Sequence, residues 1–441
     1  MVFTPSNCIF VFRNFDFKIL YTMSTLIKSA TIIDTSSPYH QQKKDILIED
    51  GVITRIDDHI PSQKDFIQVT EENLHVSCGW FDTSVSFGEP GYEERETIKN
   101  GLTVAAKSGF TAVAVNANTN PVIDNKAAVE FLTNKAQGFA TKLYPIAALT
   151  KQSEGKEMAE LFDMQQSGAI AFGDYKKPIV NDNLMKISLL YAQNFNGLVV
   201  SFPKNQAIAG DGIANEGVNS TKLGLKGIPA LAEALQIASN LFILEYTGGK
   251  LHIPTISTAR SVALIKEAKK KGLQVSCSVA AHHLVLTDDE LHEFESNYKT
   301  NPPLRTKADC KALQKGIRTG VIDIITSDHN PIDIEYKKVE FSEAKNGTIG
   351  LESFFGAVNA VLNLSDFIEN ITSKPRSIFG IEAAAIALGE KADISLFNPE
   401  GKDTFTKKHI LSTSKNSAFI NKQMLGKVYG IFSNNQLILN S

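Results

Sequence analysis

Short runs of alternating apolar and polar residues mark both ends of the chain as β-rich. Between Thr25 and about Val76, the run LIKSATIID is followed by DILIEDGVITRIDD, which contains an Asp50-Gly51 pair. Alternation on both sides of an Asp-Gly pair predicts a β-hairpin. The C-terminal part shows the same pattern in ADISLFN, SAFIN, GKVYGIFSN and NQLILN. Because neither end has enough strands to stand alone, we expect the two ends to pair.

The middle of the chain, from Gly79 to roughly Leu362, has a different pattern. Apolar runs alternate there with amphipathic stretches that predict helices, such as residues 126–137. Strands that are buried on both faces and are each followed by a helix form parallel sheets. Seven or eight of them favour a closed (β/α)8 barrel. The runs are FTAVAVN, KLYPIAAL, GAIAFGD, GLVVSF, LFILEY, QVSCSVA and DIITSD.

Together, these patterns predict an α/β protein with two domains. Residues 24–77 and 386–441 are expected to form a small β-sandwich, and residues 78–385 a TIM-like (β/α)8 barrel inserted between its two halves. Residues 1–23 precede the regular pattern. We expect them to be a non-native or disordered N-terminal extension, with Met23 as the natural start. A signal peptide is the alternative, although this stretch lacks a clean apolar core followed by a small-residue cleavage site.

Composition narrows the classes of partner. With 43% hydrophobic and 21% charged residues, the 441-residue chain has the composition of a globular protein. A formal charge of −3 without a strong Lys/Arg block argues against nucleic acid and anionic membranes as partners. No apolar run approaches the ~20 residues that span a bilayer. Four cysteines without CxxC spacing argue against a thiolate zinc site and favour a reducing, cytoplasmic location.

A series of motifs runs in one order along the chain from Thr25 to Ser441. The motifs are GWFDTSVSFGEPGYEERETIKNGLTVAAKSGFTAVAVNANTNPVID, NEG, LGLKGIP, AEALQIA, LHIPTIST, AAHHLVLTDDEL, NPPLR, IDIITSDHNPI and GLESFF. In this order they resemble the long-chain dihydroorotases, which are cyclic amidohydrolases of pyrimidine synthesis. The resemblance implies the barrel and the β-sandwich. It also implies a hydrolase that opens and closes the ring of dihydroorotate with one or two zinc ions.

At the zinc-ligand positions that the resemblance implies, this chain carries hydroxyl side chains. The family motif Asp-x-His-x-His-x-Arg falls on residues 82–88, where both histidines are replaced by serine. Two further histidine ligands of the family are replaced in the same way. The four positions hold Ser84, Ser86, Ser201 and Thr255. Because an un-ionised hydroxyl is not among the usual protein ligands of zinc, we expect no metal cofactor, and zinc only if the site is rebuilt.

Some polar residues of the family's site remain. Asp328 matches the aspartate that binds metal and acts as base, and Asp174 falls where the family often has a bridging acidic residue. Asn118 and Asn301 match positions that bind the substrate. Their alternative role is structural, because Asn-Pro pairs are common turn formers.

Two substrate contacts of the family are absent, and three histidines have structural interpretations. Gly88 replaces the arginine that clamps the substrate carboxylate, and Ile332 replaces a substrate-binding histidine. We expect His252 to be a packed or supporting imidazole. We expect the adjacent His282 and His283 to lie on an extended segment and to point to opposite faces, which makes a poor chelate.

The loss of the metal together with two substrate contacts predicts that ordinary dihydroorotase turnover is absent. We therefore expect a non-catalytic family member that acts through its surface, as a homodimer. The resemblance makes aspartate carbamoyltransferase its leading partner. Two alternatives stay open. One is an active cyclic amidohydrolase with a poorer or altered metal site, because magnesium tolerates carboxylate ligands more readily. The other is a sensor that binds a ligand in the old pocket without turnover.

Overall fold

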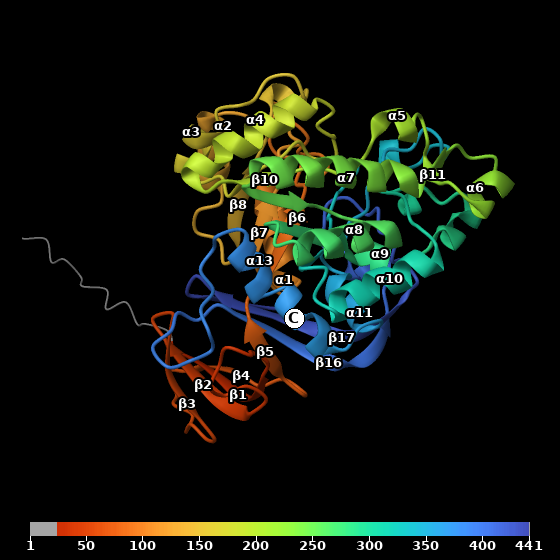
Figure 1. Cartoon of the computed structure of the whole chain (residues 1–441). Coiled ribbons are helices and arrows are strands. Elements are labelled where there is room, and N and C mark those ends of the chain that lie inside the picture. Colours follow the sequence, from red (N-terminus) through yellow and green to blue (C-terminus); the bar gives the residue numbers. More distant parts are fainter. Residues whose placement is uncertain (1–23, 441) are drawn as a thin grey trace, which may run out of the picture.

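Eight parallel strands form a barrel at the centre of the computed structural model, which describes residues 24–440 (Figure 1). The expectations for residues 1–23 lie outside this described part. A bridge between Val85 and His329 brings the first and last strands of the barrel together. The predicted (β/α)8 barrel is therefore confirmed. Its strands, in sheet order, are β6 (Trp80–Val85), β7 (Phe110–Val115), β8 (Lys142–Ala147), β9 (Ala171–Phe172), β10 (Leu198–Val200), β13 (Lys250–Ile253), β14 (Val275–Ala280) and β15 (Ile324–Thr326).

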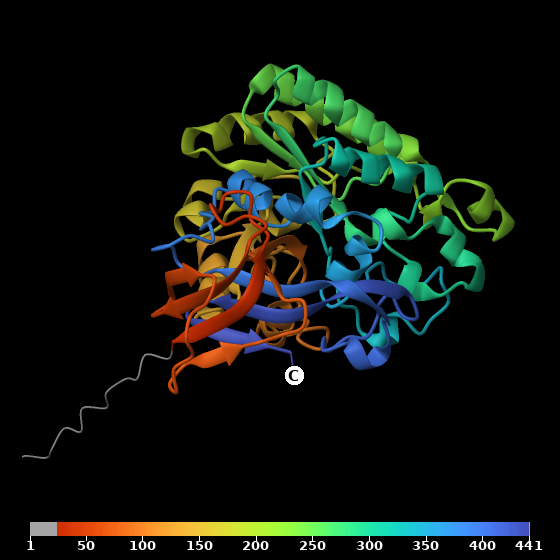
Figure 2. The same ribbon diagram turned by 90° about the horizontal axis from the view of Figure 1, so that it is seen from below.

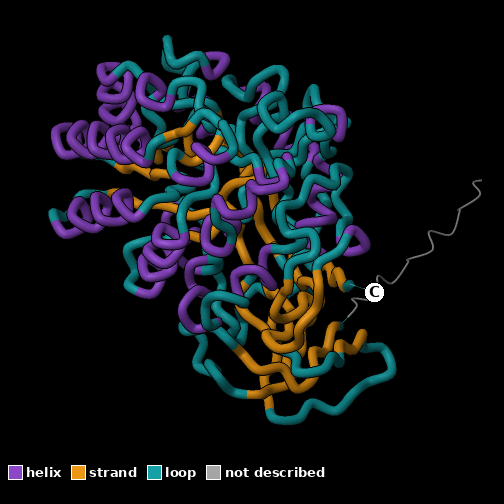
Figure 3. The backbone as a smooth tube through the Cα atoms, turned by 90° about the vertical axis from the view of Figure 1, so that its right-hand side faces the viewer, coloured by secondary structure: helices purple, strands orange, loops and turns teal. Residues whose placement is uncertain are grey.

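Helices cover the outside of the barrel, as the tube in Figure 3 shows. The first of them begins after Thr97, whose side chain accepts from the Asn100 N–H at 3.2 Å, and it ends with Lys107 in its last turn. Such a cap and a terminal cation favour helix formation. The main helices are α1 (Ile98–Lys107), α2 (Lys126–Lys135), α3 (Leu161–Gln166), α4 (Asp182–Ala192), α7 (Ala230–Thr247), α8 (Ala259–Lys270), α10 (Lys307–Arg318), α11 (Phe354–Asn359) and α13 (Ser373–Ile378). The helix expected at residues 126–137 is confirmed by α2.

Shorter elements complete the loops around the barrel. They are α5 (Gln206–Ala209), α6 (Val218–Lys222), α9 (Ala281–Val285), α12 (Leu364–Phe367) and the paired strands β11 (Ala214–Asn215) and β12 (Gly227–Ile228). None of the helices described between residues 24 and 440 is both long and apolar enough to cross a membrane.

Two of the expected strands are wrong. The run LFILEY, residues 241–246, belongs to α7, where Leu241 and Leu244 are buried and Phe242 and Tyr246 are exposed. The strand that takes this place in the barrel is the four-residue β13 just after the helix. A run this short cannot be told from helix by its pattern alone. The run SAFIN, residues 417–421, forms a turn.

The two ends of the chain share one sheet of eight strands, and Figure 2 shows the red N-terminal strands beside the blue C-terminal strands. The junction is antiparallel, with Ile394 opposite Cys78. Asp50 and Gly51 have φ angles of 52° and 77°, as the predicted hairpin turn requires. The strands are β1 (Thr25–Ile32), β2 (Lys43–Glu49), β3 (Val52–Asp57), β4 (Ile67–Val69), β5 (His75–Cys78), β16 (Ile394–Thr404), β17 (Gln423–Ser433) and β18 (Gln436–Leu439).

A buried ion pair joins the barrel to this terminal sheet. Arg376 in α13 donates to Asp393 Oδ2 and to Thr111 Oγ1, both at 2.8 Å, and to the Gly79 carbonyl oxygen at 3.1 Å. Asp393 lies just before β16 and also accepts from Ser433 Oγ at 2.6 Å. Only 2% of the Arg376 side chain is exposed, so these partners must compensate the free-energy cost of burying its charge.

Replacing Arg376 by methionine should lower the free energy of unfolding by about 3–5 kcal/mol, because the Asp393 carboxylate would lose its counter-charge. Urea unfolding followed by circular dichroism measures this loss. The matched control is Lys374→Met in the same helix, whose half-exposed contact with Glu369 at 3.6 Å should contribute less than about 1 kcal/mol. Equal losses in the two variants would contradict the prediction.

Candidate functional site

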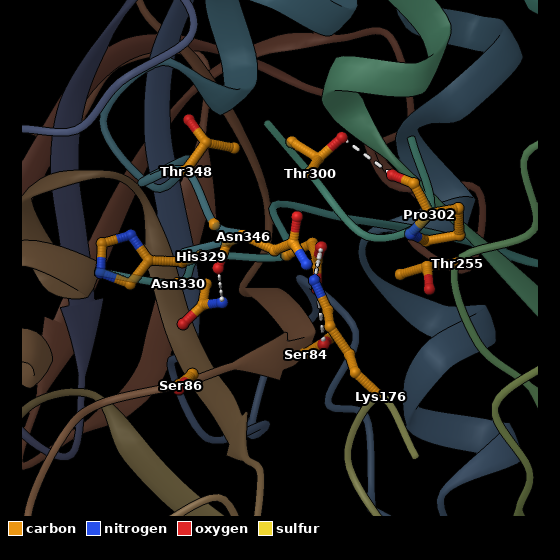
Figure 4. Close-up of polar contacts among 12 residues, drawn as sticks. Ser84, Ser86, Lys176, Thr255, Thr300, Pro302, His329, Asn330, Asn346 and Thr348 are labelled. Carbon is orange, nitrogen blue, oxygen red and sulfur yellow. Dashed lines mark hydrogen bonds and ion pairs between the residues drawn. The ribbon is translucent and has the colours of Figure 1, made fainter. Parts of the chain in front are cut away.

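Polar side chains from several strands meet at the carboxyl end of the barrel, the end where barrel enzymes carry their chemistry. Ser84 lies on β6, Asp328 follows β15, and Tyr175 and Lys176 lie in the loop after β9. Figure 4 shows Lys176 extending towards Ser84, with Thr255 to one side and Ser86 farther away. The barrel thus brings together residues that are up to 244 positions apart in the sequence.

Asp328 is the centre of these contacts. Its Oδ2 accepts from Lys176 Nζ at 2.7 Å, while its Oδ1 has longer contacts with Ser84 Oγ at 3.3 Å and the Tyr175 hydroxyl at 3.4 Å. Burial raises the pKa of the Asp328 carboxyl, and the charge and hydrogen bond of Lys176 oppose this rise. The carboxylate expected to act as the residual base is therefore bound to a lysine ammonium group.

Asp174 holds the loop that carries Tyr175 and Lys176. Its Oδ1 accepts the backbone N–H groups of Leu149 and Thr150 at 3.0 and 3.1 Å, and its Oδ2 accepts from Thr150 Oγ1 at 2.5 Å. These bonds fix the loop after β9 to the end of β8. Because its acceptor sites are used in this way, the carboxylate serves the loop rather than a bridged metal pair.

The hydroxyl groups at the expected zinc-ligand positions are mostly bound to asparagines. In each of three pairs an asparagine Nδ2 donates to a serine Oγ. The pairs are Asn116 with Ser84 at 3.1 Å, Asn118 with Ser86 at 2.6 Å and Asn240 with Ser201 at 2.9 Å. The fourth position, Thr255, has its backbone N–H bound to Ser278 Oγ at 3.1 Å and a φ of 47°. The serines are therefore satisfied by neutral protein donors.

This set of donors does not fit a zinc ion. A catalytic zinc takes three protein ligands from imidazole, thiolate and carboxylate groups. Here the carboxylate is already paired with an ammonium group, and the other candidate groups are neutral hydroxyls. Among residues 24–440, no three His, Cys, Asp or Glu side chains are grouped so that they could hold a metal ion. Magnesium accepts oxygen ligands more readily, but it would meet the same positive charge.

The histidines near the site are packed into the protein. His252 Nδ1 lies 2.9 Å from Ser276 Oγ, and its Nε2 lies 3.2 Å from Ser278 Oγ. Burial lowers the pKa of His252 to about 3, so its imidazole is neutral. The expectation that His282 and His283 lie on an extended segment is wrong. Both belong to the short helix α9, and their ring centroids are 4.4 Å apart.

None of the four positions at which the resemblance implies substrate contacts opens onto the cavity. A Cβ atom at Gly88 would lie 1.8 Å from the Tyr92 carbonyl oxygen, so the surrounding backbone leaves no room for an arginine. Ile332 is buried. Asn118 is bound to Ser86, and neither Asn118 nor Asn301 is among the residues that line the remaining cavity.

The remaining cavity at this end of the barrel is very small. About 20 Å³ is left for water-sized molecules, which is roughly the space of one water. A pocket that takes a small organic ligand usually measures about 300–1,000 Å³. The lining includes Tyr175, Lys176, Phe202, Phe379 and Asp328. Sequence reasoning missed Tyr175 and Lys176, although they follow the apolar run GAIAFGD directly.

The fold is that of the hydantoinases. L-hydantoinase from Arthrobacter aurescens superposes with a TM-score of 0.82 at 18% identity, covering 95% of this chain and 96% of that one. A D-hydantoinase from Thermus sp. superposes with a TM-score of 0.78 at 20% identity, covering 94% and 95%. At such low identity these structures establish the architecture alone, a (β/α)8 barrel with strand-rich terminal segments.

Sequence comparison gives the family. A protein-family model described as Dihydro-orotase-like matches residues 75–261. The dihydroorotase of Trichlorobacter lovleyi is 36% identical over 410 residues, and that of Pelotomaculum thermopropionicum is 37% identical over 410 residues. Each alignment covers 92% of this chain and 96% of the relative. The chain belongs to the dihydroorotase family, as its motifs suggested.

Asp82 ties the first barrel strand to the last. Thr326 Oγ1 and the Ser84 N–H donate to its Oδ1, the latter at 3.1 Å, and the Ser327 N–H donates to its Oδ2 at 3.1 Å. Burial raises the pKa of Asp82 to about 6, against the opposing effect of these hydrogen bonds. In the unfolded chain, the same carboxyl titrates near its ordinary value of about 3.9.

The raised pKa of Asp82 predicts a specific pH dependence. Between about pH 4 and pH 6 the folded state holds more of this proton than the unfolded state, so the contribution of Asp82 to stability falls as pH rises through that window. Asp82→Asn lacks the titration. Its free energy of unfolding minus that of the wild type should rise by up to about 3 kcal/mol between pH 4 and pH 7. Denaturant titrations at four pH values measure it, and parallel pH curves for the two proteins would refute it.

Proposed function

We propose that this dihydroorotase-family protein has no dihydroorotase turnover and serves pyrimidine biosynthesis through its surface, in a structural or regulatory role in the cytoplasm. One observation carries the proposal. At the carboxyl end of the barrel, Lys176 and Tyr175 occupy the space around Asp328, and the cavity left there is about 20 Å³. Such a cavity is far smaller than the pockets that usually take small organic ligands.

The chemistry of the site supports the same conclusion. Opening a stable cyclic amide needs an activated water and a group that stabilises the developing oxyanion. Asp328 is engaged by an ammonium group, and the oxygens around it are serine and tyrosine hydroxyls. Loss of a single strong oxyanion stabiliser alone lowers a rate by about a hundredfold to a thousandfold.

An assay of dihydroorotate ring opening tests the proposal directly. With zinc or magnesium added, the purified protein should show less than about one thousandth of the turnover of the Trichlorobacter lovleyi dihydroorotase measured alongside. Turnover that appears with one added metal would support the altered-metal alternative instead. Dihydroorotate should also leave the melting temperature unchanged, since a bound ligand would raise it and favour the sensor alternative.

An apolar outer face on α4 and α7 supports a role at the protein surface. Large apolar side chains project from both helices and from Val180, two residues before α4, and soluble proteins rarely expose so many in one place without an interaction to cover them. The exposed side chains are Val180, Ile187, Leu190, Tyr191, Leu231, Leu235, Phe242 and Tyr246. The two helices are also linked by a bond from Ser239 Oγ to Asp182 Oδ1 at 3.1 Å. We propose this α4–α7 face as the contact between two copies in a homodimer, with aspartate carbamoyltransferase as the partner of the assembled protein.

The double variant Phe242→Glu/Tyr246→Glu should convert the dimer into a monomer, because these side chains are 71% and 80% exposed and would place like charges at the contact. Light scattering coupled to gel filtration measures the mass. Leu388→Glu, an exposed apolar position outside the barrel helices, is the control and should leave the mass unchanged. A wild-type protein that is monomeric, or a double variant with unchanged mass, would exclude this face. Co-purification with the carbamoyltransferase of the same organism tests the second partner.

A further inference from the structure

We propose that the ammonium group of Lys176 has taken over the place of a metal as the permanent counter-charge of Asp328, so that this end of the barrel is built to fold and stay closed without an ion. This inference deepens the proposed function and rests on it. Its starting point is the mismatch between the donors present and the zinc ion that the family implies.

The ion pair is buried and direct. Lys176 Nζ lies 2.7 Å from Asp328 Oδ2, and the two side chains are only 11% and 2% exposed. Burying a carboxylate without a counter-charge costs free energy. An ammonium group within hydrogen-bond distance compensates this cost, as a metal ion would. Lys176 is the only Lys or Arg that forms an ion pair with Asp328 in the described part of the chain.

The backbone is arranged to deliver this pair. Lys176 and Asp328 have φ angles of 55° and 50°, values that non-glycine residues adopt rarely. Asp174 fixes the loop on one side of Lys176 through the N–H groups of Leu149 and Thr150. On the other side, Lys177 Nζ donates to the Ser153 carbonyl oxygen at 3.2 Å. The loop is therefore held at both flanks while Lys176 points into the barrel.

The other side chains that hydrogen-bond to the pair are neutral. Tyr175 places its hydroxyl on Asp328 Oδ1 and its ring 5.2 Å from Lys176 Nζ, where the ring face favours a cation. Ser84 adds a second hydroxyl at 3.3 Å. His282 and His283 lie within the electrostatic reach of Lys176, and burial lowers the pKa of both so that neither competes as a cation.

A consequence separates this inference from simple loss of ligands. If only the ligands were missing, restoring histidines at positions 84 and 86 would restore metal binding, because two imidazoles and the Asp328 carboxylate make a set of three zinc ligands. If Lys176 occupies the site, a divalent cation must first displace a hydrogen-bonded ammonium of the same charge sign. Metal binding then requires removal of the lysine as well.

The metal test uses the full chain and measures zinc bound per protein by elemental analysis after dialysis. Ser84→His/Ser86→His should retain less than about one tenth of a zinc per chain, and the same double variant with Lys176→Gly should retain about one, at a position whose positive φ suits glycine. Equal zinc in the two variants, whether near one or near zero, would overturn the inference. Wild type and Lys176→Gly alone serve as the controls for adventitious zinc.

The stability test uses thermal unfolding. Lys176→Met should lower the melting temperature by roughly 5–10 °C, because it leaves Asp328 unpaired. Lys176→Met/Asp328→Asn should regain most of this shift, which a role in packing alone would not produce. Lys177→Met is the matched control in the same loop and should lower the melting temperature by less than half as much. A double variant no more stable than Lys176→Met would contradict the counter-charge role. Neither bound zinc nor melting temperature depends on catalysis. Ring-opening activity in the wild type would therefore overturn the proposed function, whereas the role of Lys176 is decided by these two measurements alone.

Discussion

A carboxylate buried at the end of a barrel strand must be compensated, and the way this chain compensates Asp328 determines the rest of the site. Zinc would supply a charge of two and would gather several ligands around one point. Lys176 supplies a single charge on a flexible stem and gathers only what its three N–H groups can reach. The surroundings of Asp328 are correspondingly simple, since two hydroxyl groups complete them. With the ammonium in place, only a small cavity remains around Asp328.

The architecture of the barrel is held mainly by contacts away from this site. Its strands are held by parallel hydrogen bonding and by a large apolar core that includes Trp80, Phe110, Phe354 and Phe397. The terminal sheet is joined to the barrel through Arg376 and Asp393. This ion pair lies near the starts of the barrel strands, at the end away from the candidate site. A fold of this kind carries its function in residues placed on strand ends, so those residues can change while the architecture stays. The chain is 36% identical to the dihydroorotase of Trichlorobacter lovleyi over 92% of its length, and its barrel mouth carries serine hydroxyls and the Lys176–Asp328 ion pair.

Much of the architecture could be predicted from the sequence, because strand burial and helix periodicity leave strong local patterns. The pairing of the two ends and the helix at Lys126–Lys135 follow from such patterns. The strand expected at residues 241–246 failed because a helix with a continuous apolar stretch has the same composition as a buried strand. The prediction that His282 and His283 lie on an extended segment was wrong for a related reason. A one-turn helix directly after a strand leaves little signal in the sequence.

The site was harder to predict because its decisive contacts join distant parts of the chain. The sequence identified Asp328 and the substituted serines, yet the partner of Asp328 lies 152 residues away in a loop whose left-handed backbone has no glycine to signal it. The role of Asp174 was hard to predict for a similar reason. An aspartate that anchors a loop and an aspartate that bridges two metal ions look the same in a sequence.

Asparagines partner the serines at three of the expected zinc-ligand positions. A serine left without a partner in a buried site would cost about 1–3 kcal/mol, and three such positions would weaken the barrel end substantially. Asn116, Asn118 and Asn240 each donate to one of them, so the cost is avoided with neutral groups. The same amides could not support a metal site in this arrangement, because their N–H groups point at the hydroxyl oxygens that a cation would need. Hydroxyl groups, asparagine donors and a lysine counter-charge therefore form a mutually consistent arrangement, and replacing one member of a pair would leave its partner unsatisfied.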